Sequence, residues 1–170
     1  VFRKRLLPTY DVFDETRYFE SGTLTNLLEY QGKRIAITIC EDVWNLSDQR
    51  YSSDPLEEIV DLEPDLLINL SASPWHLNKE EQRKDLLRKV VEKVQCPVSY
   101  INAVGGNDEL IFDGHSMSID RSGEVIAQSS SFRECLEVHD LGESPMPTNH
   151  EMDKMESLRQ ALVLGIRDYA

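Results

Sequence analysis

The stretch Arg34–Trp44 reads RIAITICEDVW, and it predicts the fold more directly than any other part of the chain. Its first half is rich in isoleucine, a pattern typical of a strand buried on both faces. Cys40 follows this strand at once and is itself followed by two carboxylates, Glu41 and Asp42. Open α/β sheets usually bind their ligands at the carboxyl ends of strands. Cys40 is therefore a candidate nucleophile, although a cysteine considered alone is more often a small buried residue.

The overall composition is that of an ordinary globular protein, with 170 residues of which 40% are hydrophobic and 29% are charged. The formal net charge of -13 argues against nucleic acid and against an anionic membrane surface as partners. No apolar run has the length of a membrane span, and the start of the chain does not resemble a signal peptide. Three widely spaced cysteines (Cys40, Cys96 and Cys135) predict neither a disulfide framework nor a metal site, so we expect no metal and a cytoplasmic location.

Two further apolar runs predict buried strands, at Asp65–Ser71 and Val98–Val104, and we expect Gly105-Gly106 to end the second of them. Strands separated by a crossover helix and followed by hairpins indicate a mixed sheet in a layered α/β fold. The other expected elements are a strand at residues 1–7, an edge hairpin at 23–32 with Gln31-Gly32 as its turn, a helix at 55–60, a hairpin at 116–128 and a strand at 131–139.

The most regular local pattern predicts a helix at Lys79–Val94, where apolar residues recur at helical spacing and charges occupy the other faces. Asn78 is its expected N-cap, and Glu81 would complete a capping box. A second amphipathic helix is expected around Met155–Ile166, after a linker at 141–149 that is rich in proline and glycine.

A cysteine nucleophile needs either a base or a nearby positive charge that stabilises its thiolate. His76 and His115 lie in predicted loops and could approach Cys40, so a Cys-His hydrolase is one interpretation. Lys4 offers another, because a fixed positive charge stabilises both the thiolate and the later oxyanion. Considered alone, Lys4 would more often be a solvated lysine.

Five motifs occur in order along the chain. They are KRLLPTYDVFDETRYF at residues 4–19, CEDVW at 40–44, NLSASP at 69–74, VGGNDELIFDG at 104–114 and ALVLGIRDY at 161–169. With these motifs the chain is similar to the nitrilase superfamily of carbon-nitrogen hydrolases, and within it to the glutaminase domain of glutamine-dependent NAD synthetase. The similarity runs nearly from end to end, which makes it more specific than a single cysteine.

The resemblance implies an α-β-β-α sandwich with a Glu-Lys-Cys triad, and it assigns roles to individual residues. Cys40 matches the nucleophile and Lys4 the lysine, while Glu41 would provide its backbone N–H to the oxyanion and its carboxylate to the substrate's ammonium group. Tyr10, Ser73 and Lys79 match positions that hold glutamine. Glu15 resembles a glutamate that supports Lys4. Glu109 lies in a loop that could face the site, and its alternative role is only to stabilise the conformation of that loop.

One part of the family pattern is missing, because the triad glutamate belongs to a motif upstream of Lys4. We therefore interpret residues 1–140 as a carbon-nitrogen hydrolase (glutaminase) domain lacking its N-terminal part. Residues 141–170 would be a linker and a helix that leads toward a synthetase domain outside this chain.

The resemblance also implies partners and cofactors. They are L-glutamine, the protein's own synthetase domain and further copies of the chain in a homo-oligomer, with ATP and magnesium expected for the synthetase domain rather than for this chain. Two alternatives stay open. One is a stand-alone nitrilase-type amidase that acts on another small amide, and the other is an inactive structural fragment.

Overall fold

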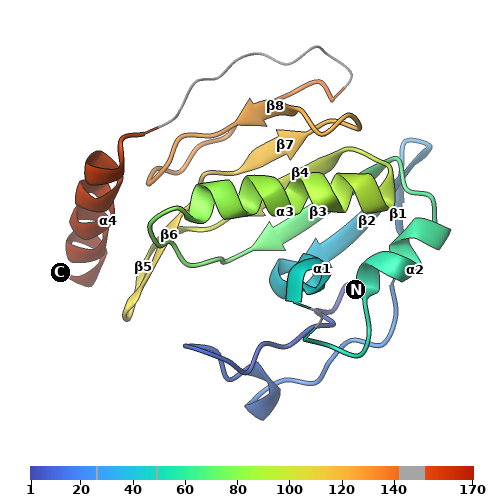
Figure 1. Cartoon of the computed structure of the whole chain (residues 1–170), viewed down its shortest axis with the longest axis horizontal. Coiled ribbons are helices and arrows are strands. Elements are labelled where there is room, and N and C mark those ends of the chain that lie inside the picture. Colours follow the sequence, from blue (N-terminus) through green and yellow to red (C-terminus); the bar gives the residue numbers. More distant parts are fainter. Residues whose placement is uncertain (26, 49, 142–151) are drawn as a thin grey trace.

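The computed structural model describes residues 1–25, 27–48, 50–141 and 152–170, and these form a mixed α/β fold around a six-stranded sheet (Figure 1). From one edge to the other, the sheet consists of β1 (Leu27–Tyr30), β2 (Lys33–Ile39), β3 (Leu66–Ser71), β4 (Val98–Asn102), β7 (Met117–Ile119) and β8 (Val125–Gln128). β2, β3 and β4 pair in parallel, whereas β1, β7 and β8 join by antiparallel pairing. The predicted fold class, a mixed sheet in a layered α/β fold, is confirmed.

Helices cover one face of this sheet. Figure 1 shows α3 (Lys79–Val94) crossing the strands, with α1 (Asn45–Asp48) and α2 (Pro55–Asp61) in contact with it. A separate hairpin of β5 (Val104–Asn107) and β6 (Leu110–Asp113) packs against α4 (Lys154–Tyr169). Short 3-10 helices span Glu15–Arg17 and Cys40–Val43.

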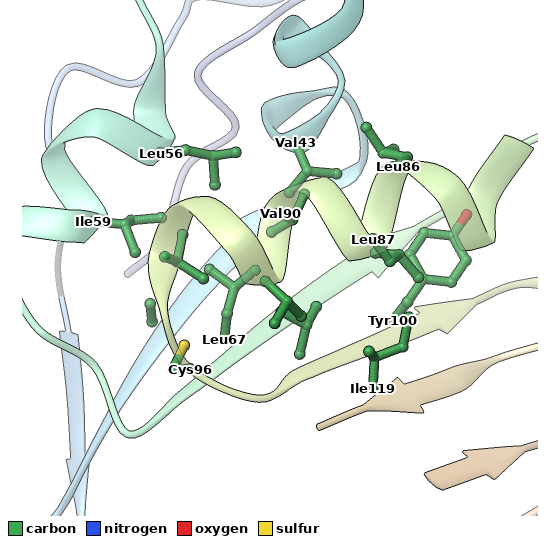
Figure 2. Close-up of a cluster of buried hydrophobic side chains, with 14 of the residues drawn as sticks. Val43, Leu56, Ile59, Leu67, Leu86, Leu87, Val90, Cys96, Tyr100 and Ile119 are labelled. Atoms are coloured by element: carbon green, nitrogen blue, oxygen red, sulfur yellow. The ribbon is translucent and has the colours of Figure 1, made fainter. Parts of the chain in front are cut away.

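The main core lies between α3 and the sheet (Figure 2). Leu87 and Val90 of α3 are fully buried against strand residues such as Leu67. The apolar residues that recur in this helix are all buried, and so is Arg83, which the pattern did not indicate. These apolar residues are Leu86, Leu87, Val90, Val91 and Val94. Burial of a Leu or Val side chain contributes about 1.5–3 kcal/mol, so this face fixes α3 on the sheet.

The prediction of a capping box at the start of α3 is wrong. Asn78 is the N-cap by position, but its φ of 67° is left-handed and its side chain makes no capping hydrogen bond. At this φ, the short side chain does not reach the free N–H groups of the first turn.

The prediction that β2 is buried on both faces is also wrong. Ala36 and Thr38 face the helices and are buried, whereas Ile35, Ile37 and Ile39 on the other face are only half-buried. The helices lie on one side, so the described residues leave the second apolar face partly uncovered.

The edge hairpin is confirmed. β1 and β2 pair from Leu27 to Ala36, and the turn is Gln31-Gly32 with φ values of 50° and 73°. Positive φ at both central residues is the geometry of the two-residue turns that match the twist of a hairpin. The hairpin of β7 and β8 and the short helix α2 also form as expected.

Gly105-Gly106 does not end a strand, because the break falls at Ala103 and both glycines belong to β5. They are needed for close packing on α4. A Cβ on Gly106 would lie 3.3 Å from the Gly165 Cα, and the Gly106 N–H donates to Asp168 Oδ2 at 2.8 Å.

Two predicted strands are absent from the described residues. Residues 1–7 form none, because the N–H groups of Arg5 and Leu6 donate to the Asp42 carboxylate instead of to a neighbouring strand. Residues 131–139 form only an isolated bridge at Ser131, since Phe132 has a φ of 58°. The nearby apolar side chains Leu136 and Val138 are almost fully exposed and find no core to cover.

The second amphipathic helix forms, but the apolar positions that predicted it, Met155, Leu158, Leu162 and Ile166, do not make up its buried face. Ala161 and Leu164 are buried, whereas Met155, Leu162 and Ile166 are exposed. Packing on the β5–β6 hairpin, rather than the widest apolar stripe, selects the buried face. Most of the predicted linker at 141–149, together with His150, lies outside the described residues.

Candidate active site

Cys40 lies at the carboxyl end of β2 and begins the 3-10 helix Cys40–Val43. Its φ of 47° is left-handed. Such geometry costs a non-glycine residue about 1–3 kcal/mol and is concentrated at functional sites, where surrounding contacts maintain it. One such contact is the donation by Asn69 Nδ2 to the Cys40 carbonyl at 3.3 Å.

The thiol opens into a cavity of about 930 Å³. The ends of three parallel strands line it, with Cys40 after β2, Ser71 and Ala72 at the end of β3, and Ala103 after β4. This is the location expected for a ligand site in an α/β sheet. Its other lining residues are Arg3, Lys4, Leu7, Phe13, Glu15, Tyr18, Phe19, Glu20, Ile39, Leu70, Ile101 and Asn102.

Lys4 and Glu15 form an ion pair in the wall of this cavity. Lys4 Nζ lies 2.6 Å from both carboxylate oxygens of Glu15, and the two side chains are 15% and 25% exposed. The structure therefore brings together Cys40, Lys4 and Glu15. The ammonium group of Lys4 is held by this carboxylate and keeps a fixed direction.

The charge on Cys40 depends on opposing effects. Burial raises the pKa of the Cys40 thiol, while the positive charge of Lys4, the Ala72 N–H and the Ser71 hydroxyl lower it. The negative charge of Glu41 also raises it, and the pKa stays above its ordinary value. At neutral pH the thiol is thus mostly protonated, and a nucleophilic role needs a base.

The Glu41 carboxylate points into a second, smaller cavity of about 340 Å³ that does not include Cys40. It accepts hydrogen bonds from Tyr10 Oη at 2.6 Å and from Tyr51 Oη at 3.1 Å. Burial and the neighbouring carboxylate raise the pKa of both phenols, so they remain donors. Tyr10 and Glu41, expected together at the substrate, therefore do lie together, and Tyr51 is a third member that sequence reasoning missed.

Lys79 lies next to the small cavity, because it contacts Trp44, which lines that cavity. The Lys79 ammonium lies 4.2 Å from the centre of the Trp44 ring, a cation–π contact. Burial and the positive charge of Arg83 lower the pKa of Lys79, while Cys40 and Glu41 raise it. Lys79 thus lies in the electrostatic range of both the thiol and the carboxylate.

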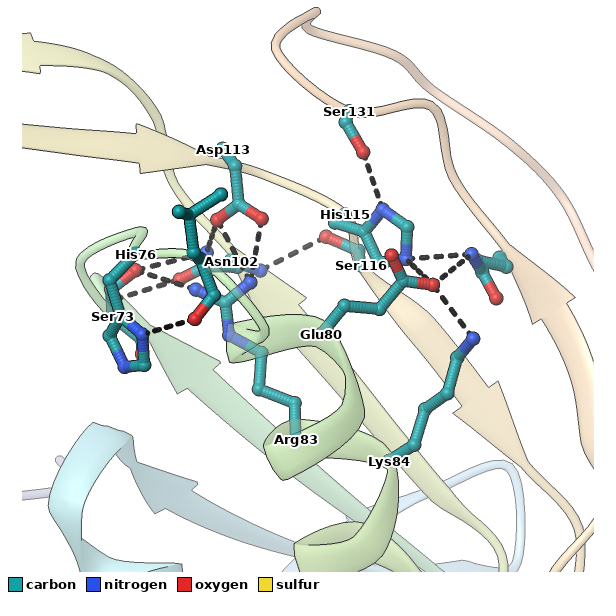
Figure 3. A network of polar contacts seen from close by, with 12 residues as sticks. Ser73, His76, Glu80, Arg83, Lys84, Asn102, Asp113, His115, Ser116 and Ser131 are labelled. Atoms are coloured by element: carbon teal, nitrogen blue, oxygen red, sulfur yellow. Dashed lines mark hydrogen bonds and ion pairs between the residues drawn. The ribbon is translucent and has the colours of Figure 1, made fainter. Parts of the chain in front are cut away.

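Ser73 was expected to hold glutamine, but its side chain does not lie in the wall of either cavity. It is 4% exposed and lines neither the cavity of Cys40 nor that of Glu41. Its carbonyl accepts from Arg83 Nη2 at 2.8 Å, and its N–H donates to Asn102 Oδ1 at 2.8 Å (Figure 3). Arg83 in turn donates to both oxygens of Asp113 at 2.8 Å. A buried network therefore fixes the loop that follows β3.

The remaining candidates lie away from the thiol. Glu109 occupies the exposed turn between β5 and β6 and does not line the cavity of Cys40. His115 is buried between Ser131 Oγ at 2.5 Å and Glu80 Oε1 at 3.1 Å, and His76 lines a different cavity (Figure 3). Neither histidine lines the cavity of Cys40, so the structure does not support the Cys-His interpretation.

Two general findings concern the described part of the chain. It holds no group of three or more His, Cys, Asp or Glu side chains arranged to bind a metal ion. Among its helices, none has the length and apolar character needed to cross a membrane.

Comparison with known proteins adds to this geometry. The sequence profile of the carbon-nitrogen hydrolase family matches residues 1–142. A glutamine-dependent NAD(+) synthetase of Synechocystis sp. is 40% identical over 178 aligned residues, which cover 99% of this chain and 32% of that protein. The chain thus spans about a third of the length of this curated relative.

Solved structures agree with the sequence comparison. Glutamine-dependent NAD+ synthetase from Acinetobacter baumannii superimposes with a TM-score of 0.84 at 33% identity, covering 99% of this chain and 32% of that one. A carbon-nitrogen hydrolase from Helicobacter pylori has a TM-score of 0.62 at 23% identity and covers 76% of this chain and 47% of that one. The second likeness concerns the fold alone.

Proposed function

The chain belongs to the carbon-nitrogen hydrolase family, and from this premise we propose that it is the glutaminase part of a glutamine-dependent NAD synthetase. The observation that carries the proposal is the cavity of Cys40, which contains a strained cysteine at a strand end together with the Lys4–Glu15 pair. The similarity to synthetases over 99% of the chain favours glutamine over another small amide.

In the proposed reaction, the Cys40 sulfur attacks the side-chain amide carbon of glutamine. The thiol proton passes to a base, and the tetrahedral oxyanion is stabilised by the Lys4 ammonium and the Glu41 N–H. The base then delivers the proton to the leaving nitrogen, which departs as ammonia. Water hydrolyses the resulting thioester to glutamate and restores the thiol.

The base is not assigned to a described residue. Glu15 faces the cavity, but both of its oxygens contact Lys4 at 2.6 Å, and it serves to orient that lysine. A glutamate from a segment outside this chain, placed over the half-buried face of β2, would complete the site. The partly uncovered apolar surface at Ile39, Leu70 and Ile101 supports a segment packing there.

Substrate selection would reside in the smaller cavity. The Glu41 carboxylate, supported by two phenols, suits an α-ammonium group, and Lys79 adds a positive charge beside it for the α-carboxylate. A substrate that reaches from Glu41 to Cys40 would span two adjacent residues of the same turn. In this arrangement Ser73 acts through the backbone of its loop.

The domain assignment is part of the proposal. Residues 1–140 would form the hydrolase part, and 141–170 would lead toward a synthetase part outside this chain. The family profile ends at residue 142, and the H. pylori hydrolase covers 76% of the chain where the synthetase covers 99%. ATP and magnesium would bind in that synthetase part, and a homo-oligomer in the cytoplasm is the setting that the family resemblance favours.

A labelling experiment tests the substrate. The intact protein is treated with 6-diazo-5-oxo-norleucine, a glutamine-like alkylating agent, and its mass is measured, with Cys40→Ser as the control. We expect a single adduct on Cys40. Cys96 is fully buried and burial raises its pKa to about 11, whereas Cys135 is exposed, so peptide mapping must separate these two from Cys40. Failure to label a folded intact protein would refute glutamine as the substrate.

A second experiment tests the division of labour. In the intact enzyme, Cys40→Ala should abolish NAD formation with glutamine and retain it with free ammonia, because the synthetase part needs only the nitrogen. Steady-state rates with each nitrogen source are compared with those of Cys135→Ala, which changes an exposed cysteine. Equal loss of both activities would contradict the proposal.

A further inference from the structure

Asp42 has an unusual set of partners for a buried carboxylate. It is 3% exposed and accepts three backbone hydrogen bonds. Oδ1 accepts from the N–H of Arg5 at 2.9 Å and of Leu6 at 2.8 Å, and Oδ2 accepts from the N–H of Ile39 at 2.9 Å. A carboxylate with three such donors is well satisfied and has a fixed orientation.

The donors belong to two segments that are far apart in sequence and meet at the thiol. Arg5 and Leu6 directly follow Lys4, and Ile39 directly precedes Cys40. One side chain therefore ties the segment that carries the lysine to the turn that carries the cysteine.

Leu6 and Leu7 of the lysine segment are buried, but in the described part of the chain its hydrogen bonds to that turn are those to Asp42. The segment belongs to no strand in the described part of the chain, so no ladder of hydrogen bonds holds it. The Lys4 carbonyl accepts from the Gly22 N–H at 2.8 Å, which fixes the segment to its own loop rather than to the sheet. The Arg5 side chain binds Glu58 and Thr25, again away from the Cys40 turn.

We propose that Asp42 is a positioning residue that holds the Lys4 ammonium beside the Cys40 thiol. The inference rests on the proposed function, in which Cys40 is the nucleophile and Lys4 its charged partner. Asp42 itself does not line the cavity of Cys40. It acts by keeping the lysine backbone and the cysteine backbone in a fixed relation.

The charges around the thiol make the idea testable. Lys4 lowers the pKa of Cys40, whereas Glu41 raises it. Removing the negative charge of Asp42 would by itself lower the pKa of the thiol, because a nearby anion disfavours a thiolate. Releasing Lys4 would raise that pKa instead. The direction of the shift therefore separates a positioning role from a simple charge effect.

The experiment measures the rate of Cys40 alkylation by iodoacetamide as a function of pH, in the intact protein, by peptide mass spectrometry. The variant is Asp42→Asn, which keeps the side-chain shape but replaces one acceptor oxygen by an NH2 group. We expect the midpoint of the alkylation profile to rise by about one pH unit, which corresponds to a roughly tenfold lower rate at neutral pH.

Two controls identify the cause. Asp54→Asn is a matched change at a carboxylate that lines neither the cavity of Cys40 nor that of Glu41 and also accepts a backbone N–H, from Leu56 at 3.0 Å, and it should leave the midpoint unchanged. In a Lys4→Met background, Asp42→Asn should no longer raise the midpoint, because the lysine is absent. A fall or no change in the midpoint of folded Asp42→Asn overturns the proposal, and so does an equal rise in the Lys4→Met background.

If Asp42→Asn does not fold, Asp42→Glu replaces it. This variant keeps the charge but is one methylene too long for the three N–H groups, so the midpoint should again rise. An unchanged midpoint in the folded variant overturns the proposal. The readout needs no glutamine, so its result is independent of whether 6-diazo-5-oxo-norleucine labels the protein.

Discussion

Substitutions in the ion pair of Arg83 and Asp113 test whether this buried network stabilises the loop that follows β3. The Arg83 side chain is 0% exposed and that of Asp113 is 5% exposed, and their two N–O distances are both 2.8 Å. Asp113→Ala removes both hydrogen bonds and leaves a guanidinium group without its anion in the interior. Breaking a buried pair from one side costs about 3–5 kcal/mol. That is a large share of the stability of a typical domain, which is about 5–15 kcal/mol.

A double variant separates the lost attraction from the stranded charge. Arg83→Met with Asp113→Leu removes both charges, and replacing a buried pair by apolar side chains is often close to neutral. We therefore expect the double variant to be more stable than Asp113→Ala, by about 2 kcal/mol or more. The residual cost comes from the Ser73 carbonyl, which loses its 2.8 Å donor and keeps only Asn102 Nδ2 at 3.4 Å.

The assay is urea unfolding of the intact protein followed by tryptophan fluorescence, with Glu156→Gln as the matched control. Glu156 also pairs with an arginine, Arg159, at 2.6 Å, but both side chains are exposed on α4, so no measurable change is expected. If Asp113→Ala lowers the free energy of unfolding by less than about 1 kcal/mol, the pair is not buried away from water as described. A double variant no more stable than the single one would refute the stranded-charge explanation.

Two further outcomes are expected. Burial would raise the pKa of Glu80, but hydrogen bonds from His115 and Lys84 hold it at about 2, below its usual 4.5. A carboxylate whose pKa is lower in the folded state stabilises the fold at pH values above its unfolded pKa. The free energy of unfolding of the wild type should therefore exceed that of Glu80→Gln by its full amount above about pH 5, and this excess should vanish toward about pH 2. An excess that stays constant across this pH range would contradict the prediction. Leu87→Ala should cost about 2–5 kcal/mol in urea unfolding because Leu87 is 0% exposed in the core of Figure 2, whereas Leu136→Ala, at a 96% exposed position, should change little; equal effects would contradict the core assignment.

Local patterns predicted much of the fold. The apolar spacing in Lys79–Val94 identified the buried face of α3, and the isoleucine-rich run before Cys40 identified β2. These predictions held because helix and strand periodicities are set by the backbone and act over a few residues. The strand expected at 131–139 did not form, because Phe132 has a positive φ and the described residues supply no layer that covers this segment, and these effects outweigh β propensity.

The candidate site was predicted only in part. Motif resemblance pointed to Lys4, Glu15 and Cys40, and the structure places all three around one cavity. The motif resemblance did not indicate that the carboxylate of Glu41 lies in a different cavity, or that Ser73 would be buried. Side-chain direction depends on the local backbone conformation and on packing, which a motif does not contain.

Local sequence patterns were enough to identify the candidate nucleophile, the parallel strand that carries it and the amphipathic helix that covers the sheet. No such pattern indicated that Arg83 pairs with Asp113, 30 residues away, or that the Asp42 carboxylate binds the N–H groups of Arg5 and Leu6 across more than 35 residues; these contacts follow from the tertiary structure. A buried charge pairs with, and a free N–H donates to, whichever partner the topology brings near it. Such a partner leaves no periodic trace along the chain.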